Sequence, residues 1–225
     1  LLSCYSLTGY SGGGKKMIAE YEAPARSALL DAPRQYALGQ THKHLKEMKA
    51  VTGLANEPVF CPVVADFYSG MQVTVPLFAS WLAPGAGMED VKNAYRTLYT
   101  GPVVSYTDAA DEGGFLSAAA QSGLDSMKIT VAGNEQRMLL LAVYDNLGKG
   151  ASGAAVECMN LVTGAGKRWV WNCNREEPQM KQISGGVCAA TGFSASGVHC
   201  GIRKNKTKRD LALIYSSVPA SAAAV

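Results

Sequence analysis

The stretch RMLLLAVYDNLGKGASGAAVECMNLV, residues 137–162, predicts a strand, a glycine-rich turn and a helix in that order. Arg137–Tyr144 is almost wholly apolar and predicts the strand, while Ala154–Val162 predicts the helix. Between them, Gly148-Lys149-Gly150-Ala151-Ser152-Gly153 has the spacing G-x-G-x-x-G. Such a turn lets backbone N–H groups approach an anion at the start of a helix. The stretch therefore favours a nucleotide phosphate or an acyl phosphate as ligand.

The G-x-G-x-x-G spacing by itself is weak evidence for a dinucleotide-binding site. A complete dinucleotide-binding unit also needs a following strand and an acidic residue about 20 residues further on. Glu176 and Glu177 lie roughly at that distance, but no convincing strand precedes them. We therefore expect a turn beside a cofactor and no complete Rossmann half.

The segments around this stretch predict an α+β domain with a mixed or antiparallel sheet and helices on one face. A hairpin turning at Gly133-Asn134 joins residues 127–132 to 137–144. The other expected strands are 1–8, 58–66, 71–78 and 103–106, with an extended segment at 36–40. The expected helices are 15–21, 41–52 and 88–99.

Composition excludes several classes of protein. With 225 residues the chain forms one large or two small domains, and its net charge of +3 is too small to indicate nucleic acid as a partner. The basic run at 203–209 favours a solvated hairpin tip over a binding patch. No apolar run reaches the ~18 residues that a membrane span needs, so no membrane partner is expected.

The six cysteines show no C-x-x-C pair and no regular spacing. In a chain of this size the pattern favours reduced thiols in a cytoplasmic protein over a disulfide framework. It also argues against a zinc site, and no metal is expected.

Two short segments contain candidate site residues. The loop Gly9–Gly14 precedes a helix that starts with two lysines, so it is either a phosphate-binding loop or an ordinary tight turn. His42 and His44 stand at the start of a helix for which Thr41 is the expected N-cap. A helix N-terminus favours a neutral imidazole, which suits general acid–base catalysis. The alternatives are surface or capping histidines, or a metal site that lacks a third ligand.

Four ordered motifs resemble one family. They are TGYSGGGKK (8–16), LGQTHKHLKEM (38–48), PVFCPVVADFYSGM (58–71) and DNLGKGASGAAVECMN (145–160). Residues 1–164 resemble the C-terminal half of N-acetyl-gamma-glutamyl-phosphate reductase, which implies the catalytic and dimerisation domain of glyceraldehyde-3-phosphate-dehydrogenase-like reductases. Lys46 departs from the family, which more often has proline there.

The resemblance implies reduction of N-acetyl-glutamyl phosphate to an aldehyde with NADPH, through attack by a cysteine thiolate, and a homo-oligomer formed through the sheet. By matched position, His44 is the acid–base residue and His42 contacts the substrate. The remaining implied contacts fall into two groups. The substrate group is Ser11, Gly12, Gly13 and Glu47. The NADP group is Asn146, Gly148, Gly150 and Gly153.

No cysteine here stands in the asparagine-proline-glycine-cysteine setting of the family's nucleophile. The resemblance therefore places that cysteine and the nucleotide-binding domain upstream, and we expect the chain to be inactive by itself. A non-catalytic substrate and dimerisation module is an alternative.

Residues 180–225 resemble the start of a glutamate N-acetyltransferase, through MKQISGG (180–186), GFSASGVHCGIRK (192–204) and DLALIYSSVPASAAAV (210–225). The expected strands at 183–188, 198–202 and 211–215 make this a partial β-rich tail. Residues 165–179 have no periodicity and are expected to be a linker, and our hypothesis for its origin is a translated intergenic spacer. A bifunctional fusion is the alternative.

Overall fold

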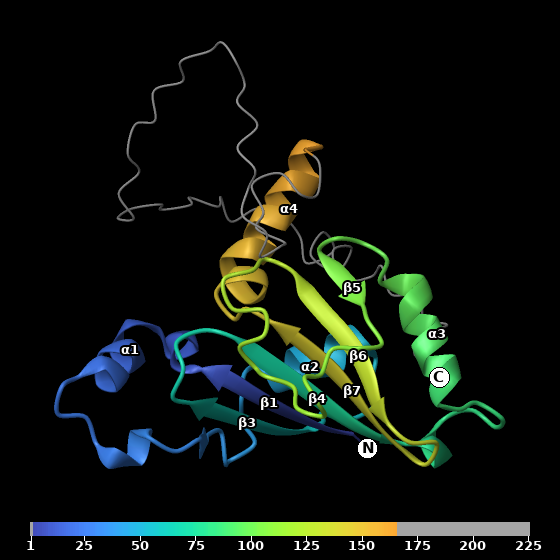
Figure 1. Ribbon diagram of the computed structural model, residues 1–225, viewed down its shortest axis with the longest axis horizontal. Coiled ribbons are helices and arrows are strands. Elements are labelled where there is room, and N and C mark those ends of the chain that lie inside the picture. The colour runs from blue at the N-terminus through green and yellow to red at the C-terminus, as the bar shows by residue number, and fades with distance from the viewer. Residues whose placement is uncertain (1, 166–225) are drawn as a thin grey trace, which may run out of the picture.

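The described part of the chain, residues 2–165 of a computed structural model, is built around one seven-stranded sheet (Figure 1). The strand order across the sheet is β2-β3-β1-β4-β7-β6-β5. The strands are β1 Ser3–Gly9, β2 Arg34–Gln35, β3 Val59–Ala65, β4 Met71–Phe78, β5 Val104–Tyr106, β6 Met127–Gly133 and β7 Arg137–Tyr144. The α-helices are α1 Gly14–Glu22, α2 His44–Thr52, α3 Met88–Leu98 and α4 Gly153–Thr163. Shorter helical turns are η1 Tyr10–Gly13, η2 Ala28–Leu30, η3 Ala79–Trp81 and η4 Gly148–Ser152.

The sheet is mixed, which confirms the predicted α+β class. The pairs β1–β3 and β5–β6 are parallel, whereas β2–β3, β1–β4, β4–β7 and β6–β7 are antiparallel. The hairpin β6–β7 turns at Gly133 and Asn134, as predicted, with Asn134 N–H donating to the Arg137 carbonyl at 2.8 Å. Because β4 is antiparallel to both neighbours, the C-terminal ends of β1 and β7 lie beside the start of β4. The candidate site includes residues from this edge of the sheet.

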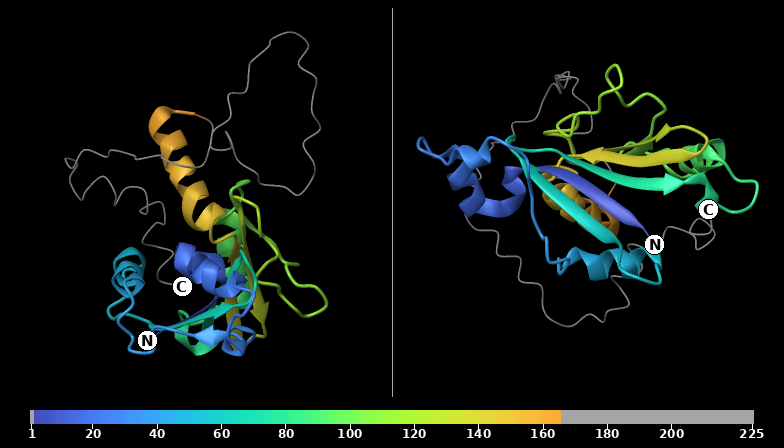
Figure 2. Two further views of the ribbon diagram at one scale, coloured as in Figure 1. Left: turned by 90° about the vertical axis from the view of Figure 1, so that its left-hand side faces the viewer. Right: turned by 90° about the horizontal axis from the view of Figure 1, so that it is seen from below.

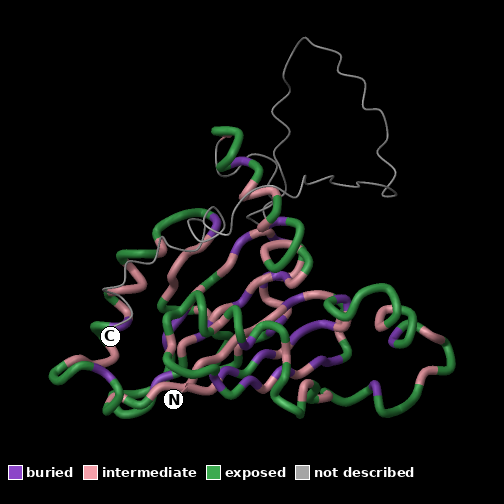
Figure 3. Tube along the Cα trace, turned by 180° about the vertical axis from the view of Figure 1, so that it is seen from behind, coloured by how far each residue is buried: buried purple, intermediate pink, exposed green. Residues whose placement is uncertain are grey.

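One face of the sheet packs against α1, α2 and α3 through three hydrophobic clusters. Below α3, Val91 packs with Val131 and Met138; below α2, Leu45 packs with Phe60. Because residues two apart on a strand share a face, this face carries the even-numbered residues of β1 and β3. Figure 3 shows the buried stretches along these strands, and the left view of Figure 2 shows α1 and α2 on this side.

Residues 2–165 cover the opposite face only in part. The segment 107–126 crosses it (Figures 1 and 2), and Val143 beneath is 2% exposed. On the same face, apolar side chains of β1, β3 and β7 are open to solvent: Tyr5 is 47%, Val59 is 55% and Leu139 is 40% exposed. We call the surface formed by these three residues the open face.

Two local predictions around the histidines are wrong. The helix begins at His44 with Lys43 as its N-cap, so Thr41 does not cap it. The segment 36–40 is not extended, because Ala37 and Gln40 have φ values of 53° and 52° and form a turn. The strand of this region is β2, which begins two residues before the expected extended segment.

Candidate functional site

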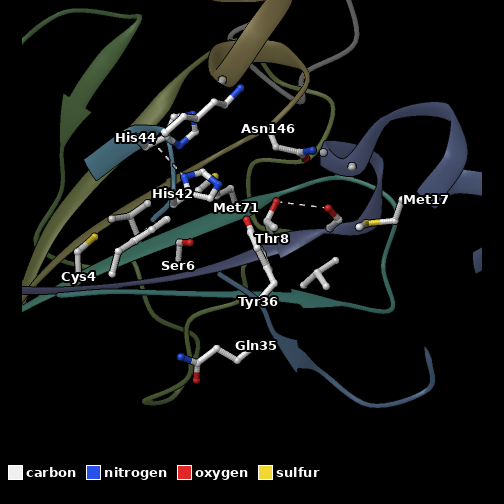
Figure 4. A pocket seen from close by; sticks show the side chains of 18 of the residues that line it. Cys4, Ser6, Thr8, Met17, Gln35, Tyr36, His42, His44, Met71 and Asn146 are labelled. Atoms are coloured by element: carbon white, nitrogen blue, oxygen red, sulfur yellow. Dashed lines mark hydrogen bonds between the residues drawn. The ribbon is translucent and has the colours of Figure 1, made fainter. Parts of the chain in front are cut away.

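A cavity of about 900 Å³ lies between the helix-bearing face of the sheet and the ends of α1 and α2. This volume is in the usual range for small-molecule sites. Figure 4 shows side chains from strands and helices that are far apart in the sequence around this space. Of the predicted site residues, it is lined by Gly12, Gly13, His42, His44, Asn146 and Gly150. The predicted residues outside its lining are Ser11, Glu47, Gly148 and Gly153.

His42 and His44 are in contact at the start of α2. Their rings are 4.6 Å apart in an edge-on arrangement, and the His42 ring also packs edge-on against Phe60 at 5.3 Å (Figure 4). His42 is half-buried and His44 is exposed. The pair therefore combines an imidazole held by packing with a neighbour that is open to solvent.

One hydrogen bond fixes the tautomer of His42. The His44 backbone N–H, which belongs to the first turn of α2, donates to His42 Nδ1 at 3.3 Å. Since Nδ1 accepts, the proton of neutral His42 is on Nε2. Burial lowers the pKa of His42, and the nearby charges of His44 and Lys43 lower it further, against the opposing effect of Glu47. This supports the expectation of a neutral imidazole at the start of α2.

We expect His42 to titrate below 6.5, its ordinary pKa, in an NMR titration, with the Nε2-protonated tautomer above that pH. Because the Lys43 charge contributes to the lowering, the Lys43→Gln variant should raise the His42 midpoint towards 6.5. A Lys46→Gln variant, one helical turn along, is the control. A wild-type midpoint above 6.5 would contradict this assignment of charges.

Asn146 joins two segments that the sequence treated separately. Its Oδ1 accepts from the Gly70 N–H at 2.8 Å, and its Nδ2 donates to Ser11 Oγ at 2.9 Å. Ser11 is 3% exposed, so its hydroxyl supports the wall behind the cavity. A predicted substrate residue and a predicted cofactor residue thus meet, and Asn146 fixes the glycine loop beside β7.

Asp145 is the buried anchor of this corner, and the sequence analysis missed it. Its Oδ1 accepts from the backbone N–H groups of Leu147 and Gly148, at 2.7 and 2.8 Å. Its Oδ2 accepts from Gly123 N–H at 2.6 Å and from Ser69 Oγ at 2.9 Å. Burial acts to raise its pKa, but these hydrogen bonds hold the pKa below the ordinary 3.8. An aspartate directly before a glycine-rich helix start was the available signal.

The predicted glycine turn is wrong as secondary structure. Residues 148–152 form a π-helical turn that runs directly into α4. A Cβ on Gly148 would lie 2.6 Å from the Leu124 carbonyl oxygen, and one on Gly153 would lie 2.7 Å from the Gly148 oxygen. Close packing therefore explains these two glycines, and Asp145 already occupies the N–H of Gly148. Their contact with a cofactor stays a prediction.

Other predicted groups are placed as follows. Glu47 is exposed, and within residues 2–165 it forms no hydrogen bond with either imidazole. Cys4, Cys61 and Cys158 are free thiols. The described residues contain no cluster of histidine, cysteine and carboxylate side chains suited to a metal ion. None of the helices in residues 2–165 is long and apolar enough to cross a membrane. The basic run and the tail from 166 onwards lie outside the described residues.

Comparisons with known proteins agree with this fold. Residues 2–146 match the family described as semialdehyde dehydrogenase, dimerisation domain. The N-acetyl-gamma-glutamyl-phosphate reductase of Sinorhizobium fredii is 40% identical over 164 residues, covering 71% of this chain and 53% of that protein. The enzyme of the same name from Allorhizobium ampelinum is 42% identical over 171 residues, covering 73% and 55%. The chain thus spans about half the length of the curated relatives it matches.

A solved structure shows the same fold. A probable aspartate-semialdehyde dehydrogenase from Pseudomonas aeruginosa superposes with a TM-score of 0.53, over 72% of this chain and 54% of that one. At 19% identity this likeness concerns the fold alone.

Proposed function

The chain belongs to the semialdehyde dehydrogenase dimerisation-domain family, and on that premise we propose that residues 1–164 are the C-terminal half of an NADPH-dependent reductase of N-acetyl-gamma-glutamyl phosphate. The observation that supports this best is the contact of His42 with His44 in the wall of a cavity. The reductases of Sinorhizobium fredii and Allorhizobium ampelinum, at 40% and 42% identity, carry that name.

The histidines supply the proton transfers of the proposed reaction. His44 is the acid–base residue, since it is solvent-exposed and can exchange protons with water. His42 has its Nδ1 occupied by the helix, so only Nε2–H is available, and as a donor it suits contact with a substrate oxygen. The nucleophilic thiolate and the nucleotide-binding domain belong to the other half of the enzyme. Localisation in the cytoplasm is part of the same proposal.

The corner around Asn146 fits one end of a nicotinamide cofactor. Asn146 and Gly150 line the cavity, and both come from the turn after β7. Gly148 and Gly153 are packed against neighbouring backbone, so they would act by shaping this turn. When bound, NADPH supplies a hydride. Gly12 and Gly13, on the α1 side of the cavity, are proposed to lie near the substrate phosphate, and Glu47 to act on the substrate site through His42.

A chimeric protein tests the function. The first half of the Sinorhizobium fredii reductase is joined to residues 1–164 of this chain in place of its own second half. We expect the chimera to restore growth without arginine to a bacterium that lacks its own reductase. A soluble, folded chimera that does not restore growth would contradict the proposal, and the intact Sinorhizobium enzyme is the positive control.

The open face is the proposed surface for a homodimer. Tyr5, Val59 and Leu139 expose 47%, 55% and 40% of their surface on one side of the sheet. Several large apolar side chains exposed on one face of a sheet are typical of interfaces between proteins. The family's description as a dimerisation domain is consistent with that use.

We expect a Leu139→Lys variant to shift the protein from dimer to monomer in size-exclusion chromatography with light scattering. A charge buried in an apolar interface costs more than the contact it replaces. Val51 is 51% exposed on α2, on the other side of the sheet, so Val51→Lys should leave the dimer intact. A dimer that survives Leu139→Lys and dissociates with Val51→Lys would place the interface on the helical side.

Residues 180–225 are proposed to derive from the start of a glutamate N-acetyltransferase, with 165–179 as a linker from an intergenic spacer. The motifs at 180–186, 192–204 and 210–225 support this, and all lie outside the described residues. The nucleotide sequence tests it. A purine-rich run should encode Arg175-Glu176-Glu177, and its absence together with an uninterrupted frame near codon 165 would contradict the spacer origin.

A further inference from the structure

Arg34 is a half-buried cation that forms no ion pair with a carboxylate of residues 2–165. The other two half-buried arginines of this region differ from it. Arg26 pairs with Asp31 and Asp66, and Arg96 pairs with Glu89 and Asp108. Burying part of a cation without a counter-charge is costly, so it calls for an explanation.

Contacts with Tyr21 orient the guanidinium of Arg34, but not all of its hydrogen-bond donors have an acceptor. Its Nη2 donates to the Tyr21 hydroxyl at 3.2 Å, and the group lies over the Tyr21 ring at 5.4 Å. Its Nε is buried and has no hydrogen-bond partner. The hydroxyl of Ser6, which is 2% exposed, has none either. Both residues line the cavity described above.

Arg34 lies at the end of the cavity remote from the histidines. Strand β2 pairs Arg34 with Val64, whereas the His42 ring rests on Phe60 of the same strand β3. Four residues of a strand span about 13 Å. A substrate whose reacting carbon faces the histidines therefore extends its other end towards Arg34.

We propose that Arg34 binds the carboxylate at the non-reacting end of the substrate. This rests on the proposed function, in which the phosphorylated γ-carboxyl carbon reacts and the α-carboxylate is the remote anion. A guanidinium binds a carboxylate through two parallel N–H···O hydrogen bonds. The Tyr21 ring, on which the guanidinium lies, fixes the plane of the guanidinium. The subsite therefore selects an acidic substrate and sets its direction in the cavity.

Two isomers with the same size and charge test the proposal by calorimetry on the full chain. N-acetylglutamine keeps the α-carboxylate, and N-acetylisoglutamine carries the amide there. We expect N-acetylglutamine to bind about 10- to 100-fold more tightly, which is the usual effect of a hydrogen bond to a charged group. Arg34→Gln should remove that preference, and Arg34→Lys should keep part of it. Lys43 lines the same cavity, so Lys43→Gln, which should retain the preference, is the matched control.

The outcomes separate this inference from the proposed function. Equal binding of the two isomers by the wild-type chain, a comparison that needs no variant, would overturn the role of Arg34 and leave the reductase proposal standing. Arg34-dependent binding of inorganic phosphate that displaces N-acetylglutamine would show a phosphate subsite and would also overturn it. Failure of both isomers to bind would contradict the proposed function, and this inference with it.

Discussion

Replacing His44 by glutamine should lower kcat of the chimeric reductase about 100- to 10,000-fold, the usual contribution of a general acid–base residue. Glutamine keeps the size and hydrogen-bonding capacity of the side chain but cannot transfer a proton near neutral pH. Because His44 is exposed at the start of α2 and packs only edge-on against His42, the substitution should leave the fold intact. Steady-state oxidation of NADPH measures the effect.

His42→Gln separates the roles of the two imidazoles. His42 has its Nδ1 engaged by the His44 N–H, so we expect its replacement to raise KM more than it lowers kcat. A loss of kcat confined to His42→Gln, with His44→Gln nearly unaffected, would reverse the assignment. Lys46→Gln, in the first turn of α2 and outside the cavity lining, is the control for a general disturbance of the helix start.

Asp145→Ala should lower the free energy of unfolding by about 3 kcal/mol, because it removes the acceptor of three partly buried backbone N–H donors. Each should cost about 1 kcal/mol, the lower end of the range for a lost partner, since water can reach these groups in part. Those donors are Leu147, Gly148 and Gly123, and Ser69 loses its acceptor as well. Urea denaturation monitored by circular dichroism measures the change. The wall made by Asn146 would be disturbed at the same time.

A control and a pH series make the Asp145 result specific. Asp111 also accepts from one backbone N–H, that of Gly114, but in an exposed turn, so Asp111→Ala should cost less than ~1 kcal/mol. Since hydrogen bonds hold the pKa of Asp145 below 3.8, its stabilisation is complete above about pH 4 and is lost as pH falls through the lowered pKa. The difference between wild type and Asp145→Ala should shrink over that range. A difference that grows on acidification would contradict the assignment.

Strong periodic patterns in the sequence predicted the main elements correctly. The alternation of Met71, Val73, Val75 and Leu77 gave a strand with one face towards the core, and the register with β7 confirms it. The hairpin at Gly133 followed from turn chemistry that is local in sequence. These features depend on neighbours a few residues away, so they can be predicted without knowing the fold.

The errors occur where a distant partner decides the local conformation. Gly148 was expected in an open turn, but Asp145 and the Leu124 carbonyl pack against it and close the segment into a helix. His42 replaces Thr41 as the group that accepts a helix N–H, because the turn at 37–40 brings the imidazole there. Arg34 showed no signal in the sequence, since its significance depends on the fold, in which it forms no ion pair with a carboxylate of residues 2–165.

Only the family resemblance assigned the histidine pair, the Ser11–Gly13 loop and Asn146 to substrate or cofactor contacts, and the hydrogen bond between Ser11 and Asn146 was not predicted. Periodicity alone gave no reason to bring the loop after β1 beside the end of β7. The sheet order, which places β4 between β1 and β7, produces that proximity.

The most direct measurement of the central claim is NADPH oxidation by the purified chimera with two acyl phosphates, N-acetyl-gamma-glutamyl phosphate and β-aspartyl phosphate. The chimera should turn over N-acetyl-gamma-glutamyl phosphate with kcat/KM at least about 100-fold higher than for the aspartyl compound. A substrate that cannot make the hydrogen bonds of the site leaves polar groups of the enzyme unpaired, and this is the reason for the discrimination. No turnover of the N-acetyl-glutamyl compound by a folded chimera, or a preference for β-aspartyl phosphate, would contradict the account.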